Sequence, residues 1–166
     1  VICPTVEAVP NITRNGHIGI LATPGTVSSQ SYVLELEKIH NLQSATCNLH
    51  ISQQSCPMWV PLIESGEYTY EGADYFVHRY LNDLLAQDSQ IDTVILGCTH
   101  YPFLLPVLQK AAGSGVRFID PAPAVARRLG NVLDEKQIPH SGEIPAGVEL
   151  LSSGPRGTLD YLFSLI

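Results

Sequence analysis

Apolar residues recur at helical spacing most clearly between Tyr70 and Gln87. They fall at positions i, i+3, i+4 and i+7, and comprise Ala73, Phe76, Val77, Tyr80, Leu81, Leu84 and Leu85. This period gathers them on one face of an amphipathic helix. We therefore predict a helix over residues 70–87 that packs one face against the rest of the protein.

Short apolar or alternating runs, closed by glycine, proline or polar residues, predict strands. These runs cover residues 17–23, 46–51, 93–97, 116–120 and 148–152. Helices are predicted over residues 28–40, 102–112, 122–133 and 158–165, with Pro102 in the first turn of its helix. Residues 53–67 contain two prolines and a glycine, which indicates a loop or a broken helix.

Strand and helix alternate along the chain. This order is typical of parallel strands joined by right-handed crossovers, so we predict an α/β fold with a parallel sheet flanked by helices. Ligands in such folds bind outside the carboxyl ends of the strands. Three turns predicted at such ends carry candidate chemistry, at residues 23–26, 97–100 and 152–154.

The composition excludes several classes of protein. Hydrophobic residues make up 45% of the chain and charged residues 15%, as in a folded globular protein. The net charge is −7 and the only basic cluster is Arg127-Arg128, so we expect no nucleic-acid partner. No apolar run approaches the roughly 20 residues of a membrane-spanning helix, and we expect no membrane partner.

The four cysteines, at positions 3, 47, 56 and 98, form no C-x-x-C pair and have no histidine at zinc-finger spacing. No structural metal site is therefore expected. The chain is richer in core residues than small disulfide scaffolds, which favours free thiols in the cytoplasm. It starts at Val1 without an initiator methionine, and we expect a piece of a longer polypeptide.

Cys98 lies where a predicted strand ends and a helix is about to begin. Backbone N–H groups and the positive end of the helix dipole would then face its sulfur and favour the thiolate. Thr99 is expected to cap the helix, and His100 to orient a carboxylate or to assist proton movement. The alternative is a packed cysteine beside a solvated histidine.

Three further residues are candidates for the same site. Glu64 follows an apolar run and precedes Gly66, so it is a candidate acid that sets the protonation of His100 or Cys98. Thr23 and Thr26 offer hydroxyl and N–H groups to a carboxylate at a helix N-terminus. As isolated residues, such a glutamate is more often a solvated loop residue, and such threonines are more often caps and turn formers.

The sequence also indicates chemistry without a cofactor. The three lysines fall on predicted helices rather than at strand ends, which argues against a pyridoxal Schiff base. No glycine-rich phosphate loop of the dinucleotide or Walker type is present. We therefore expect neither an organic cofactor nor a metal.

Several motifs together resemble the glutamate racemases of the aspartate/glutamate racemase family. Residues 97–102 match the G-C-T-H-Y-P signature of that family, and residues 19–27 resemble its G-x-x-x-T-x-x-T turn. Residues 55–64 resemble the A-C-P-x-x-x-P-x-x-E segment, and residues 118–121 and 152–154 match later strand ends. The resemblance covers nearly the whole chain.

This resemblance implies a two-base mechanism in which cysteines on opposite faces of the amino acid exchange its α-proton. Cys98 would be the second cysteine of the pair, with Thr99 and His100 binding substrate or assisting it. Glu64 would support that side, and Thr23 and Thr26 would hold the carboxylate or amino group of the substrate. Cys56, although part of a family segment, is interpreted as structural.

Enzymes of the family that this chain resembles carry a D-S-G motif and a C-N-T motif in their first half. Both motifs are absent from this sequence. The resemblance therefore implies a C-terminal part, with residues 1–115 forming the second domain and residues 116–166 completing the first. We expect the parent protein to interconvert L- and D-glutamate for peptidoglycan. The isolated chain is expected to be inactive and, because of open strand edges, to dimerise or aggregate.

Two other interpretations stay open at this point. One is a related enzyme of the same fold, such as an aspartate or hydantoin racemase or a one-cysteine decarboxylase. The other is a non-catalytic binding module that kept the fold after losing half of the site.

Overall fold

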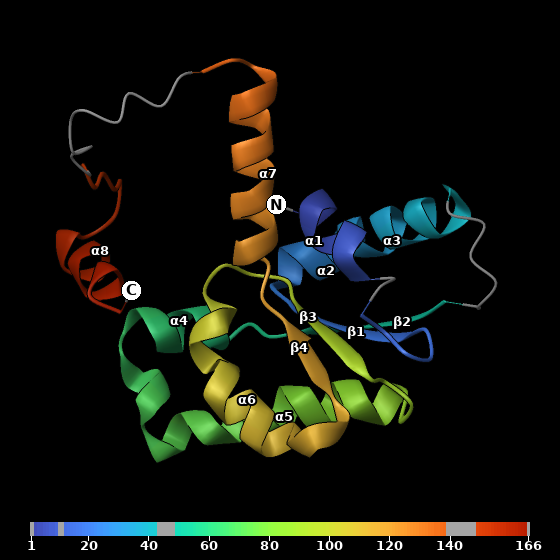
Figure 1. Ribbon diagram of the computed structural model, residues 1–166. Coiled ribbons are helices and arrows are strands. Elements are labelled where there is room, and N and C mark those ends of the chain that lie inside the picture. Colours follow the sequence, from blue (N-terminus) through green and yellow to red (C-terminus); the bar gives the residue numbers. More distant parts are fainter. Residues whose placement is uncertain (1, 10–11, 43–48, 139–148, 166) are drawn as a thin grey trace.

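The computed structural model describes residues 2–9, 12–42, 49–138 and 149–165, and its centre is a four-stranded parallel sheet (Figure 1). The strands are β1 (His17–Ala22), β2 (His50–Ser55), β3 (Thr93–Leu96) and β4 (Arg117–Ile119), in the order β2-β1-β3-β4. Every pairing is parallel. The predicted fold class, a parallel sheet flanked by helices, is confirmed.

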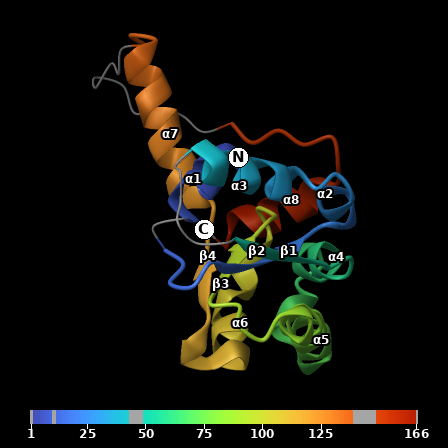
Figure 2. The same cartoon turned by 90° about the vertical axis from the view of Figure 1, so that its right-hand side faces the viewer.

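Helices cover both faces of the sheet (Figures 1 and 2). One face carries α1 (Ile2–Ala8), α2 (Pro24–Ser28) and α3 (Ser31–Leu42). The other carries α4 (Trp59–Glu64), α5 (Glu71–Gln87) and α6 (Leu105–Ala112), with the short 3₁₀ turns η2 (Glu67–Thr69), η3 (Tyr101–Leu104) and η4 (Gly113–Gly115). None of the described helices is long and apolar enough to cross a membrane.

Alternation along β1 divides the core between the two faces. Ile18, Ile20 and Ala22 pack with α1 and α3, whereas Leu21 packs with α4, α5 and α6. Gly19 also faces α5, where a β-carbon would come within 2.7 Å of Leu84 Cδ2. A glycine at this position therefore allows α5 to approach the sheet closely.

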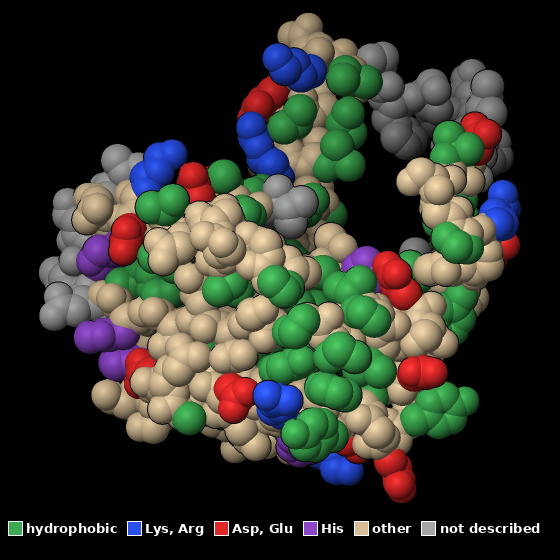
Figure 3. Space-filling model, turned by 180° about the vertical axis from the view of Figure 1, so that it is seen from behind, with side chains coloured by type: hydrophobic (Ala, Val, Ile, Leu, Met, Phe, Trp, Pro, Cys, Tyr) green, Lys and Arg blue, Asp and Glu red, His purple; other side chains and the backbone are tan. Residues whose placement is uncertain are grey.

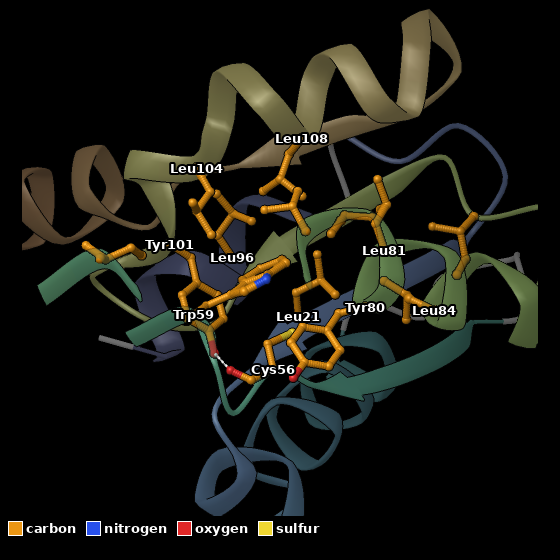
Figure 4. Packing of buried hydrophobic residues seen from close by; sticks show 14 residues of the cluster. Leu21, Cys56, Trp59, Tyr80, Leu81, Leu84, Leu96, Tyr101, Leu104 and Leu108 are labelled. Carbon is orange, nitrogen blue, oxygen red and sulfur yellow. Dashed lines mark hydrogen bonds between the residues drawn. The ribbon is translucent and has the colours of Figure 1, made fainter. Parts of the chain in front are cut away.

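The larger core surrounds Trp59 at the start of α4 (Figure 4). Its ring meets Tyr101 edge-on at 4.7 Å between ring centroids, and Tyr80 at 5.9 Å. Its indole N–H donates to the carbonyl of Phe76 at 3.3 Å, and the Tyr101 hydroxyl donates to the Cys56 carbonyl at 3.1 Å. These contacts fix α4, which carries Glu64, against the segment that follows Cys98.

The last two helices depart from this compact arrangement. Helix α7 (Ala122–Glu135) projects from the carboxyl end of β4, and α8 (Arg156–Phe163) lies beside α4 (Figures 1 and 2). Only Ala124 of α7 is buried, while Leu129 and Leu133 are 59% and 37% exposed. Leu129 and Leu133, called the apolar part of α7 below, are therefore left exposed by the described residues.

Several predicted elements need correction. The second strand covers residues 50–55, whereas residues 46–51 were predicted. Residues 46–48 of that prediction lie outside the described part. Residues 149–152 form no strand, and α1 was not predicted. The segment 28–40 is divided by Gln30, whose positive φ of 51° separates α2 from α3. Because β4 pairs with β3, the sheet also continues past residue 115.

Candidate active site

Cys98 lies immediately beyond β3, at the carboxyl end of the sheet. The preceding Gly97 donates its N–H to the Leu21 carbonyl at 2.7 Å. A β-carbon at Gly97 would lie 2.8 Å from the Ala22 β-carbon and 3.1 Å from the Leu21 carbonyl oxygen. Only glycine fits this close approach of two strands, which fixes the backbone that presents the Cys98 thiol.

Cys98, His100 and Glu64 form a connected chain of polar groups. The Cys98 sulfur lies 3.8 Å from His100 Nδ1, and His100 Nε2 lies 3.1 Å from Glu64 Oε1. Glu64 ends α4, whereas His100 directly precedes η3. The structure thus brings together the three predicted catalytic residues, although two of them lie 36 positions apart in sequence.

The charges of this chain of groups reinforce one another. Partial burial opposes ionisation of Cys98, but hydrogen bonds from the His100 side chain and from the backbone N–H groups of His100 and Tyr101 outweigh it. The pKa of the thiol is therefore lowered. The hydrogen bond to Cys98, with the negative charges of Cys98 and Glu64, raises the pKa of His100 against its desolvation. This arrangement favours a thiolate–imidazolium pair.

Cys98 opens into a cavity of about 200 Å³. Its lining is drawn from α1, α2, α3, the turn after β3 and the residue before α7, and comprises Ile2, Thr26, Tyr32, Gly97, Cys98, Thr99 and Pro121. The predicted ligand residues Thr26 and Thr99 therefore reach the same space as the thiol. Ile2, Tyr32 and Pro121 were not predicted, because tertiary packing alone brings these helix ends to Cys98.

The threonines occupy two different places. Thr23 directly precedes α2 and its hydroxyl lies 2.9 Å from that of Thr26, so it supports the cavity wall without lining it. Thr99 lines the cavity, but the expected helix cap at Thr99 is wrong. His100 holds the capping position of η3, and no side chain caps it.

The remaining candidate positions do not join this site in the described structure. Cys56 is buried, and burial raises the pKa of its thiol strongly, as suits a packing residue. Cys3 is exposed on α1, and Cys47 lies outside the described residues. The turn at residues 152–154 is exposed and follows no strand, so its predicted place at a strand end is wrong.

Fold and site define the class of protein: a parallel α/β domain that presents an activated cysteine at the carboxyl ends of its strands. The sequence matches the Asp/Glu/Hydantoin racemase family over residues 4–129. The chain belongs to this family, which confirms the resemblance inferred from the motifs.

Individual relatives and solved structures are glutamate racemases. The enzyme of Enterococcus faecalis is 36% identical over 145 residues, which are 87% of this chain and 50% of that one. The enzyme of Bacillus cereus is 34% identical, over 99% of this chain and 58% of that one. A Bacillus anthracis isoform superposes with a TM-score of 0.71 at 33% identity, over 82% and 48% of the two chains.

A Francisella tularensis glutamate racemase in complex with D-glutamate superposes with a TM-score of 0.72 at 27% identity, over 86% of this chain and 49% of that one. The present chain thus spans about half the length of the relatives it matches.

The His100→Asn substitution tests the electrostatic arrangement. Without the imidazolium, burial opposes the thiolate and the pKa of Cys98 rises, so alkylation of Cys98 by iodoacetamide at pH 7 is expected to slow about tenfold. In the wild type the rate falls only once the pH drops below the lowered pKa of the thiol. Rates followed by mass spectrometry across pH should show the variant profile displaced to higher pH. An unchanged profile would contradict the ion pair.

Proposed function

We propose that this chain is the C-terminal part of a glutamate racemase, an enzyme that interconverts L- and D-glutamate without a cofactor. The observation that carries the proposal is the activated Cys98, with His100 and Glu64 behind it, at a cavity lined by Thr26 and Thr99. Membership of the racemase family and the glutamate racemases among its relatives support this substrate.

In the proposed reaction the Cys98 thiolate removes the α-proton from one face of glutamate. The new S–H bond forms as the Cα–H bond breaks, and the electron pair moves onto the α-carbon and its carboxylate. A thiol on the opposite face then donates a proton and inverts the configuration. Among the described residues that line the cavity, Cys98 is the only cysteine, so the second base must come from elsewhere.

We propose that residues 1–115, together with β4 of the same sheet, form the second domain of the enzyme, and that the rest of residues 116–166 completes the first. The unpartnered apolar part of α7 supports this division (Figure 3). An apolar pocket of about 280 Å³, lined by Thr99, Val125 and Leu129 among others, joins that surface to the site. An N-terminal half seated on α7 would therefore lie next to Cys98, where the second base is required.

The proposed enzyme would act in the cytoplasm and supply D-glutamate for peptidoglycan. The free state of Cys3, Cys56 and Cys98 agrees with a reducing compartment. Without an N-terminal half, the exposed apolar part of α7 would promote homodimers or aggregates, which light scattering across concentrations would detect.

A substrate panel tests the proposal against other members of the family. The chain would be joined to the N-terminal half of the Enterococcus faecalis glutamate racemase, a protein called the fusion below. We expect the fusion to turn over D-glutamate at least about 100-fold faster than D-aspartate or a hydantoin, because discrimination depends on polar groups placed for one side-chain length. Faster turnover of aspartate or a hydantoin would contradict the proposed glutamate specificity and would indicate an aspartate or hydantoin racemase instead.

A further inference from the structure

Tyr32 is a buried residue of the Cys98 cavity that the proposed mechanism does not use. It is the second residue of α3, its side chain is 2% exposed, and it lines the cavity together with Cys98 and Thr26. A β-carbon at Gly97 would lie 3.1 Å from Tyr32 Cε2, so the ring packs directly against the peptide that precedes Cys98. The phenol is therefore held rigidly beside the thiol.

The Tyr32 hydroxyl has no hydrogen-bond partner among the described residues, unlike the buried hydroxyl of Tyr101, which donates to Cys56. Gln53 Oε1 is the one fully enclosed side-chain oxygen or nitrogen without a partner in the described part. The Tyr32 oxygen is not an enclosed atom of this kind, and Tyr32 lines the Cys98 cavity. A buried hydroxyl in this position gains most from an acceptor supplied by a ligand.

The charge state of Tyr32 suits a donor. Burial, together with the negative charge of Cys98, raises the pKa of Tyr32 to about 12. The phenol therefore keeps its proton at neutral pH beside the thiolate. A protonated phenol can donate to an anion without adding negative charge to the site.

We propose that the Tyr32 hydroxyl donates a hydrogen bond to a carboxylate of the molecule that occupies the Cys98 cavity. Tyr32 is thereby a substrate-binding residue, in addition to the threonines. The proposal rests on the proposed function only for the identity of this molecule as an amino acid.

Two alkylating agents test the proposal on the intact 166-residue chain. Iodoacetate carries a carboxylate, whereas iodoacetamide is a neutral analogue of nearly the same size, and both react with the Cys98 thiolate. The rate at the Cys98 peptide would be measured by mass spectrometry for the wild type and for Tyr32→Phe, which keeps the ring and removes the hydroxyl. Tyr80→Phe, at a buried phenol in the other core cluster, is the matched control.

We expect Tyr32→Phe to slow iodoacetate about tenfold and iodoacetamide less than about twofold, because a hydrogen bond to a charged acceptor is lost. Tyr80→Phe should leave the ratio of the two rates unchanged. An equal slowing of both agents would show that the hydroxyl acts on the thiolate or on the fold, and would overturn the proposal. An unchanged ratio in Tyr32→Phe would overturn it as well.

Failure of the proposed function has a different signature. In that case wild-type Cys98 would react with iodoacetamide no faster than free N-acetylcysteine at pH 7. The ratio of the iodoacetate and iodoacetamide rates does not depend on the absolute reactivity of the thiol, so it reports on Tyr32 separately.

Discussion

Cys98→Ser is expected to lower glutamate racemisation by the fusion at least about 1,000-fold, the upper part of the range for loss of a general base. Serine keeps nearly the same shape, but its hydroxyl is a far weaker acid than a thiol and would not ionise beside His100. The initial rate of change in optical rotation or circular dichroism of D-glutamate gives the measurement.

Cys3→Ser is the control for this substitution. Cys3 is exposed on α1 and does not line the cavity, so its replacement should change the rate less than about twofold. The assignment of Cys98 as a base would be contradicted if Cys98→Ser kept more than a tenth of the wild-type rate while the far-ultraviolet spectrum showed the same folded protein.

Trp59→Ala is expected to lower the free energy of unfolding of the chain by about 3–5 kcal/mol. The indole is fully buried and contacts both Tyr80 and Tyr101, and the substitution also removes the hydrogen bond that its N–H donates to the Phe76 carbonyl. Urea unfolding followed by circular dichroism at 222 nm measures the loss, because the substitution removes the only tryptophan of the chain.

Leu34→Ala provides the comparison for Trp59→Ala. Leu34 is 58% exposed on α3, so truncating it should change the free energy of unfolding by less than about 0.5 kcal/mol. A loss below about 1 kcal/mol for Trp59→Ala would mean that Trp59 is not the centre of the larger core.

The strands that the sequence located most accurately, β1 and β3, are central in the sheet. Helices cover both faces of these two strands, so nearly every side chain along them must be apolar. A continuous apolar run of this kind is easily recognised in a sequence. Strand β2 lies at the edge, where the half-buried Gln53 and Gln54 are tolerated. Its position is set by pairing of His50 to Ser55 with β1 rather than by its own pattern, which explains the displaced prediction.

Residues 149–152 show the opposite error. Leu150 and Leu151 are apolar, but a strand also needs a neighbour for its backbone hydrogen bonds, and none of the described strands pairs with this segment. Leu151 is instead 79% exposed. Composition alone therefore cannot distinguish a strand from an apolar segment that lacks its packing partner.

The part of the site that could be predicted is the part encoded by local sequence. Cys98 and His100 are neighbours, and their place at a strand end follows from the apolar run before them. His100 and Glu64 come together because Trp59 packs α4 against the segment after Cys98. The resemblance to the family implied that these two residues belong to one site, but their spacing in the sequence did not. Tyr32 was missed because an aromatic residue at a helix start is usually part of the core.

Racemisation of D-glutamate by the isolated 166-residue chain and by the fusion tests the central claim most directly. The isolated chain supplies one base to one face of the substrate, so sustained change in the circular dichroism of D-glutamate is expected only with the fusion. Loss of that activity in Cys98→Ser of the fusion would assign it to this site. Sustained racemisation by the isolated chain would contradict the account of Cys98 as half of a two-base site.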